Sequence, residues 1–270
     1  MSEADTQFFS LLENPDYYEK SFRIIFGKQH RLKHCTAEAR LLDQGLQEVM
    51  NHYTAHYDTK RIRAVGATLS SALSLLAAAY LHAMSHYNYT LICRPDDIRI
   101  HYEGVTLLFE LGAQPEPMDK DTAGRSVWRE EAVRKLFTDC IVPLYSRIGE
   151  LSRIDRHTQW SFVANTLSRS YEAWLDAAQT EELRQRLLED REYVLQATDP
   201  DWFGGPGRNG EHPLYVDFKF LPDLYEEGSQ VRMKPRCCLY YQLTGTYCYT
   251  CPIISEEKRA ERAKELTGKG

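Results

Sequence analysis

The chain has 270 residues, enough to bury a substantial hydrophobic core, and carries a net charge of -6 at pH 7. This acidic balance argues against a nucleic-acid partner, because neutralising several phosphates requires a basic surface. The opening Met-Ser-Glu-Ala-Asp lacks the basic and apolar regions of a secretory signal. The most apolar stretch, 72–84, is shorter than the ~20 residues that cross a bilayer, so it predicts a buried helix. We therefore expect a cytoplasmic protein without a transmembrane segment.

The N-terminal part of the sequence predicts helices followed by an antiparallel hairpin. Residues 36–57 favour a helix that Thr36 can cap, and the Ala- and Leu-rich residues 63–87 favour a helix buried on most sides. Apolar and polar side chains then alternate over 98–103 and again over 105–111, which is typical of two paired strands with one buried face. Residues 89–93 can add a third strand.

Helical patterning returns after the hairpin. Residues 128–174 favour helices, with Pro143 at a helix start or a kink, and 181–196 favour an amphipathic helix. Apolar side chains recur at every second position over 214–220, which predicts a strand that leads to the cysteines. The mixed charges of 256–264 favour a solvated terminal helix.

These elements predict an α+β protein that is largely helical, with an antiparallel sheet and a C-terminal lobe that carries four of the cysteines. Residues 112–124 contain two prolines and show no periodicity, so they form a loop or a boundary. We expect three regions: helices and antiparallel strands in 1–112, a helical middle in 113–212, and a strand, the cysteine-bearing segment and a terminal helix in 213–270.

The distribution of the seven cysteines is the main signal in the sequence. In a reducing compartment, cysteines are better interpreted as thiols or metal ligands than as disulfides. Three are isolated and are expected to be small buried hydrophobic residues: Cys35, Cys93 and Cys140. Four fall close together near the C-terminus and form the candidate site: Cys237, Cys238, Cys248 and Cys251.

Four thiolates are the ligand count of structural zinc and of a 2Fe-2S cluster alike. Cys248-x-x-Cys251 followed by Pro252 forms a knuckle that suits either metal. The adjacent Cys237 and Cys238 are more informative, because consecutive side chains in extended backbone point to opposite faces. Such a pair chelates one tetrahedral zinc poorly, whereas a two-iron cluster is long enough for both sulfurs to reach. The spacing therefore favours an iron-sulfur cluster.

The C-terminal motif resembles that of bacterial siderophore-iron reductases of the ferrioxamine and ferrichrome reductase type. The shared features are the Cys pair, a loop, and Cys-x-x-Cys-Pro, together with Arg236, Tyr241 and Gly245. Residues 140–144 and 160–165 look like the helical region that these proteins share with siderophore synthetases, so the resemblance covers about 130–255. One departure is that nine residues separate Cys238 from Cys248, where the family pattern has ten.

This resemblance implies a cytoplasmic ferric siderophore reductase with a 2Fe-2S cluster on the four cysteines. The implied substrate is a ferric siderophore, of the hydroxamate type. Oxygen donors of siderophores hold iron(III) much better than iron(II), so one electron is enough to release the metal. Two alternatives stay open: a zinc-binding interaction module, and an iron-sulfur redox sensor.

Three cations precede the cysteines at every second position, namely Arg232, Lys234 and Arg236, and would share one face of a strand. They are candidates for docking an anionic iron chelate or an acidic protein, although an ordinary solvated basic face explains them equally well. No nicotinamide or flavin motif is found. Gly205–Gly210 matches a glycine-rich fingerprint but lacks the required preceding strand and following helix. Electrons must then come from a reduced ferredoxin or a flavin-dependent reductase.

Two histidine pairs have the four-residue helical spacing that can bind a metal: His52 with His56, and His82 with His86. Neither has the glutamate that a zinc protease needs beside its first histidine. We therefore assign both pairs to packing or to the surface.

Overall fold

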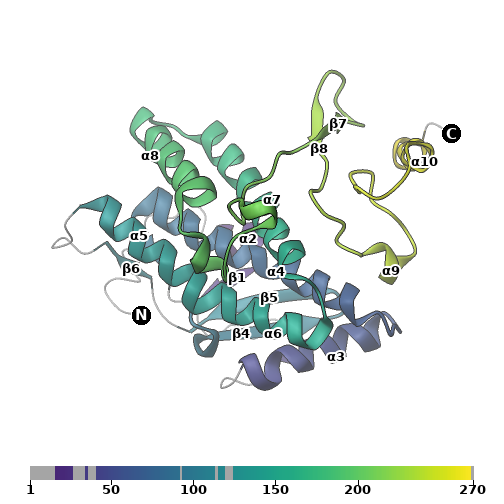
Figure 1. The fold of residues 1–270 in the computed structure, drawn as a ribbon, viewed down its shortest axis with the longest axis horizontal. Coiled ribbons are helices and arrows are strands. Elements are labelled where there is room, and N and C mark those ends of the chain that lie inside the picture. Colours follow the sequence, from purple (N-terminus) through teal and green to yellow (C-terminus); the bar gives the residue numbers. More distant parts are fainter. Residues whose placement is uncertain are drawn as a thin grey trace.

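The computed structural model describes residues 16–26, 34–35, 41–91, 93–112, 115–118 and 124–268. These residues form the α+β fold that the sequence predicts, with a helical body, small sheets, and a C-terminal segment that extends away from the body (Figure 1). The α-helices in these ranges are α2 (Tyr17–Phe22), α3 (Leu46–His56), α4 (Ile62–His82), α5 (Arg125–Lys135), α6 (Val142–Ser152), α7 (Arg156–Ala177), α8 (Glu181–Glu192), α9 (Tyr241–Thr244) and α10 (Glu256–Thr267).

Most of the predicted helices are confirmed. Several continue into or follow a wider π-helical turn: Leu41–Gly45, Ala83–Tyr87, Leu136–Ile141 and Tyr193–Ala197. Pro143 lies in the first turn of α6, directly after the π-helical turn Leu136–Ile141, where the helix changes its hydrogen-bonding pattern. Ser255 caps α10 by accepting a hydrogen bond from the N–H of Lys258. Thr36, the predicted cap of the first helix, lies outside the described residues.

The predicted hairpin is confirmed. β4 (Ile98–Glu103) pairs antiparallel with β5 (Thr106–Leu111), with Ile100 opposite Phe109. The sheet is mixed rather than purely antiparallel, because β1 (Ile24–Phe26) adds to β5 in parallel; β2 (His34–Cys35) completes the order β1-β5-β4-β2. The third strand expected in 89–93 is shorter and lies elsewhere: β3 (Tyr89–Thr90) pairs with β6 (Glu116–Pro117) in a separate sheet.

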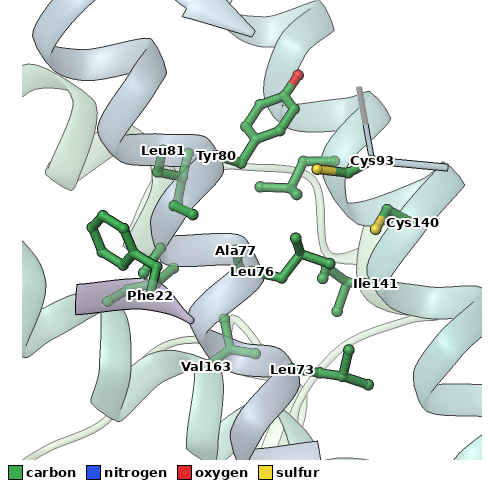
Figure 2. Close-up of a cluster of buried hydrophobic side chains, with 14 of the residues drawn as sticks. Phe22, Leu73, Leu76, Ala77, Tyr80, Leu81, Cys93, Cys140, Ile141 and Val163 are labelled. Atoms are coloured by element: carbon green, nitrogen blue, oxygen red, sulfur yellow. The ribbon is translucent and has the colours of Figure 1, made fainter. Parts of the chain in front are cut away.

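Helix α4 is the centre of the core and packs against α6 and α7 (Figure 2). Gly66 permits its close approach to α6, because a Cβ there would lie 2.1 Å from Oγ of Ser152. The continuous helical stretch Ile62–Tyr87 has the length and apolar character of a membrane span, but 83% of its most apolar window is buried inside the protein. This is the burial of a core helix. The described residues therefore contain no clear transmembrane segment.

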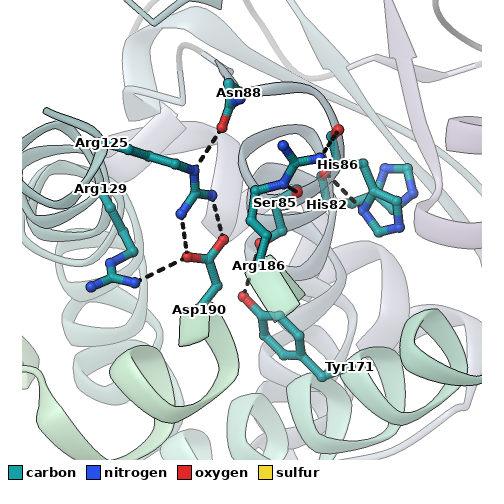
Figure 3. Close-up of polar contacts among 9 residues, drawn as sticks. All are labelled: His82, Ser85, His86, Asn88, Arg125, Arg129, Tyr171, Arg186 and Asp190. Carbon is teal, nitrogen blue, oxygen red and sulfur yellow. Dashed lines mark hydrogen bonds and ion pairs between the residues drawn. The ribbon is translucent and has the colours of Figure 1, made fainter. Parts of the chain in front are cut away.

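A buried ion-pair cluster holds α8 against α5 (Figure 3). Both carboxylate oxygens of the fully buried Asp190 accept hydrogen bonds from Arg125, at 2.7 and 2.6 Å, and Arg129 adds a third contact at 3.3 Å. The guanidinium of Arg125 also donates to the side-chain oxygen of Asn88 at 2.8 Å. Asp190 therefore links α8 to α5, and through Arg125 to Asn88, which follows the π-helical turn Ala83–Tyr87.

The strand predicted over 214–220 is wrong for most of its length. The strand β7 spans only Phe220–Pro222 and pairs with β8 (Gln230–Arg232), while residues 214–219 have no strand partner in the described chain. Burial nevertheless alternates along this stretch, because Leu214 is buried in the core and Phe218 packs against Arg232, whereas Tyr215 between them is exposed. The two-residue period therefore reflects an extended chain lying on other side chains.

Residues 215–268, the cysteine segment, have almost no hydrophobic core of their own. All of these residues are described, and only Cys251, Ile254 and Arg259 among them are buried. A segment of this size rarely holds a unique structure without disulfides or a metal. Contacts with the helical body supply part of its organisation, because Leu239 and Leu243 pack against the core and Tyr240 contacts Tyr57.

Candidate metal centre

A loop, a short helix and a knuckle bring the four predicted cysteines together. After the Cys pair, α9 ends at Gly245, whose φ of 76° is readily adopted by glycine, and the chain returns to Cys248. The N–H of Cys251 then donates to the carbonyl of Cys248 at 3.1 Å, which closes the predicted knuckle. The N–H of Lys234 donates to the carbonyl of Thr250 at 3.0 Å and so fixes the knuckle beside the approach to the Cys pair.

The four sulfurs form two pairs around one cavity. Sγ of Cys237 lies 3.7 Å from Sγ of Cys251, and the thiols of Cys238 and Cys248 are near enough to shift each other's pKa. All four line a cavity of about 280 Å³. Within the described part of the chain, no three Cys, His, Asp or Glu side chains form a group around a single metal position.

The backbone turns sharply directly after the Cys pair. Leu239 has a φ of 57°, a conformation that non-glycine residues seldom adopt. Its N–H points back to Sγ of Cys237 at 3.4 Å. The turn therefore aims a backbone donor at the first sulfur, which also contacts Cys251.

The site already favours thiolate at one sulfur. The pKa of Cys238 is lowered to about 5, chiefly because Cys248 donates a hydrogen bond to it, and the Nζ of Lys234, 3.6 Å away, adds to the effect. The same shared proton raises the pKa of Cys248, and burial raises that of Cys237 to about 11. Burial alone would lower the pKa of Lys234, but its interactions with Cys238 and Cys248 raise it overall.

The three cations expected to share a strand face have three different environments. Strand β8 ends at Arg232. The guanidinium of Arg232 pairs with Glu172 of α7 and lies 4.1 Å above the ring of Phe218, so it joins the cysteine segment to the helical body. Lys234 points at the sulfurs. Arg236 points away from them, into a second cavity beside α7.

Helix α10 supports the knuckle from the other side, which the charge pattern of this helix did not predict. Arg259 is buried, donates to the carbonyl of Tyr249, and reaches Sδ of Met233 at 3.8 Å. Arg262, one turn later, lines the sulfur cavity. The mixed charges of this helix predict a solvated surface on all sides, and they do not indicate which arginine is buried.

Cys93, Cys140 and the histidine pairs behave as packing residues, whereas the side chain of Cys35 lies outside the described part of the chain. Cys93 and Cys140 are both buried and lie near each other in the core (Figure 2), although they are far apart in sequence. The rings of His82 and His86 stack 4.0 Å apart inside the protein (Figure 3). His52 stacks on His56 at 6.2 Å and contacts the carbonyl of Gly104.

The residues present fit a 2Fe-2S cluster, in which each iron takes two thiolates. Two sulfurs bound to one tetrahedral metal at about 2.3 Å lie roughly 3.8 Å apart, which matches the 3.7 Å between Cys237 and Cys251. A single zinc ion would require all four sulfurs at that spacing around one point. The two-and-two grouping, beside a cavity that all four line, suits a two-metal group better.

No family model and no curated protein sequence matches this chain. The resemblance to siderophore-iron reductases therefore depends on the cysteine motif with its flanking residues and on residues 140–144 and 160–165.

Proposed function

We propose that this protein is a cytoplasmic ferric siderophore reductase that holds a 2Fe-2S cluster on Cys237, Cys238, Cys248 and Cys251. The observation that carries the proposal is the convergence of these thiols, as two pairs, on one cavity. A segment with almost no apolar core gives independent support, because such a segment needs a metal or a similar constraint. When bound, the cluster supplies a reversible one-electron couple.

The chain's own residues would position and tune this group. Lys234 and the N–H of Leu239 both direct positive charge at the sulfurs. Hydrogen bonds and charges near the sulfurs are the means by which a protein sets the potential of an iron-sulfur centre.

The substrate follows from the resemblance and from coordination chemistry. Siderophore oxygens are hard donors that retain iron(III) and release iron(II), so the protein needs only to deliver one electron to the chelate. The glycine-rich stretch Gly205–Gly210 forms a short turn around Arg208–Gly210, not a strand-to-helix junction that could hold a dinucleotide. A reduced ferredoxin or a flavin-dependent reductase is therefore the proposed electron donor.

Anaerobic purification with iron, zinc and sulfide analysis and a visible spectrum tests the cofactor. We expect iron and labile sulfide in equal amounts, about two of each per chain. Cys248→Ala should lose both, whereas Cys93→Ala, which removes a buried thiol of the core, should retain both. Stoichiometric zinc without iron would identify the zinc-binding interaction module instead.

Stopped-flow mixing of the reduced protein with several ferric siderophores tests the activity. Reoxidation should be much faster than that of an unrelated ferredoxin of similar potential. Equal rates for the two proteins would favour the redox sensor over the reductase.

A further inference from the structure

A second cavity lies next to the cysteine site, on the side to which Arg236 points. It measures about 180 Å³ and is lined by the start of α7, the 207–216 loop, and Pro235 with Arg236. We call it the arginine pocket, after Arg208 and Arg236. Because Arg236 directly precedes Cys237, its Cα lies about 3.8 Å from that of the first cysteine.

The arginine pocket has an excess of uncompensated positive charge. Among the described residues, neither Arg208 nor Arg236 forms an ion pair or a side-chain hydrogen bond, and both line the cavity. Both guanidiniums border the same cavity of about 180 Å³, so their like charges are held near one another. An anion between them would relieve this repulsion.

The acidic and histidine side chains in and beside the pocket do not cancel the charge of its two arginines. Glu211 is the acid in the pocket lining. Asp155, which faces Arg236, is already engaged by Arg63 at 2.8 Å and by the N–H and hydroxyl of Thr158. The pKa of His157 is lowered, first by burial and then by Arg156 and Arg236.

His212 is also fixed in the pocket wall. It contacts the hydroxyl of Thr198 at 2.8 Å and accepts a hydrogen bond from the N–H of Leu214 at 3.2 Å. Burial lowers its pKa. Both histidines are therefore neutral groups near neutral pH, and the charge of the pocket comes from its arginines.

We propose that the arginine pocket binds a carboxylate arm of an anionic ferric chelate and so places its iron(III) beside the Cys237 end of the site. The planar guanidinium matches a carboxylate with two parallel hydrogen bonds. The cavity is too small for a whole chelate but large enough for one arm. This inference rests on the proposed function, and it names hydroxycarboxylate chelates as the substrate class in place of the hydroxamates that the sequence resemblance implies.

Binding of redox-inert gallium(III) complexes tests the pocket separately from electron transfer. The purified holoprotein is titrated calorimetrically with gallium(III) citrate and with the gallium(III) complex of a neutral trihydroxamate. Arg208→Gln and Arg236→Gln should each weaken citrate-complex binding about tenfold or more, and added salt should weaken it further. Arg169→Gln, on the exposed face of α7, is the matched control and should change neither affinity.

Arg208→Lys distinguishes recognition from simple charge. It keeps the charge but loses the planar fork, so it should bind citrate complex with intermediate affinity. Circular dichroism of each variant checks that the fold is retained.

The outcomes separate the two proposals. Equal affinity for the two gallium complexes would overturn the pocket proposal, and so would citrate-complex binding that neither arginine substitution weakens. In either case, rapid reduction of ferric siderophores would still support the reductase. Arginine-dependent binding without any chelate reduction would support the pocket and reject the reductase. If the substitutions weaken only the interaction with a reduced ferredoxin, the pocket is a protein-docking surface and the inference is wrong.

Discussion

The ammonium of Lys234 lies 3.6 Å from Sγ of Cys238, with most of its side chain shielded from solvent. In a reductase, this distance places a fixed positive charge beside the redox centre. A cation there stabilises the more negative, reduced state and so raises the midpoint potential.

Replacing Lys234 by Gln should therefore lower the midpoint potential. Two unit charges at 4 Å interact by about 4 kcal/mol at an effective dielectric constant of 20, and 1.4 kcal/mol corresponds to about 59 mV for one electron. With solvent screening, we expect a decrease of roughly 50 to 150 mV in a spectroelectrochemical titration.

Two controls accompany this measurement. Lys234→Arg keeps the charge and should stay close to the potential of the unmodified protein. Lys219→Gln removes an exposed lysine from the same segment and should change little. An unchanged potential in Lys234→Gln would show that the lysine does not act on the cluster.

Arg259→Ala should loosen the knuckle without touching a cysteine. The buried guanidinium donates to the carbonyl of Tyr249, and losing a hydrogen bond to a charged donor costs about 1.5–3 kcal/mol. Hydrogen exchange of the Cys251 amide should then accelerate about tenfold to a hundredfold, in the metal-free as well as the loaded protein. Lys264→Ala, on the exposed side of α10, should leave that exchange rate unchanged, and equal rates in both variants would contradict the anchoring role.

Local pattern predicted much of this molecule, because helix periodicity and hairpin alternation are encoded in neighbouring residues. The buried helix over 63–87 and the hairpin of 98–111 were predicted for this reason. The parallel addition of β1 to β5 was missed, since it depends on contacts between distant parts of the chain. The extended stretch 214–219 was assigned to a sheet because alternation reports alternate burial and not strand pairing.

In the candidate site, too, local sequence features were predictable and contacts between distant segments were not. The cysteine spacing predicted a common location for the four thiols, and all four line one cavity; their role as ligands of a cluster stays a prediction. It did not predict that Arg232 binds Glu172 while Lys234 faces the sulfurs, since equal spacing in sequence implies one face only where the strand continues. Nor did it predict Arg208 opposite Arg236, because a loop and a distant segment meet there only in the folded chain.

Asp190→Asn should strongly destabilise the helical body. The carboxylate is fully buried and receives hydrogen bonds from Arg125 and Arg129, so its removal leaves two guanidiniums without a counterion. Breaking such a pair costs about 3–5 kcal/mol. Glu189→Gln, the exposed neighbour on α8, should change the free energy of unfolding by less than about 1 kcal/mol in urea denaturation. A similar loss in both variants would contradict the structural role of Asp190.

The stacked pair His82 and His86 should make stability depend on pH. Burial lowers the pKa of His82 to about 2 and that of His86 to about 4, each from an ordinary value of 6.5. Between these folded values and 6.5 the unfolded chain binds more protons than the folded one, so stability rises with pH through this window and is complete above 6.5. Each histidine contributes up to about 2 kcal/mol between pH 5 and pH 7.5.

His86→Leu should remove one of these contributions. Its free energy of unfolding, measured in urea at pH 5 and pH 7.5, should differ between the two values by up to about 2 kcal/mol less than in the unmodified chain. Met84→Leu, a buried change on the same helical turn, removes no titratable group and is the control. Because carboxylates outside the pair titrate alike in both variants, the difference between their slopes isolates His86. If the change in unfolding free energy between pH 5 and pH 7.5 is the same in His86→Leu and Met84→Leu, His86 does not gain a proton on unfolding and the prediction is wrong.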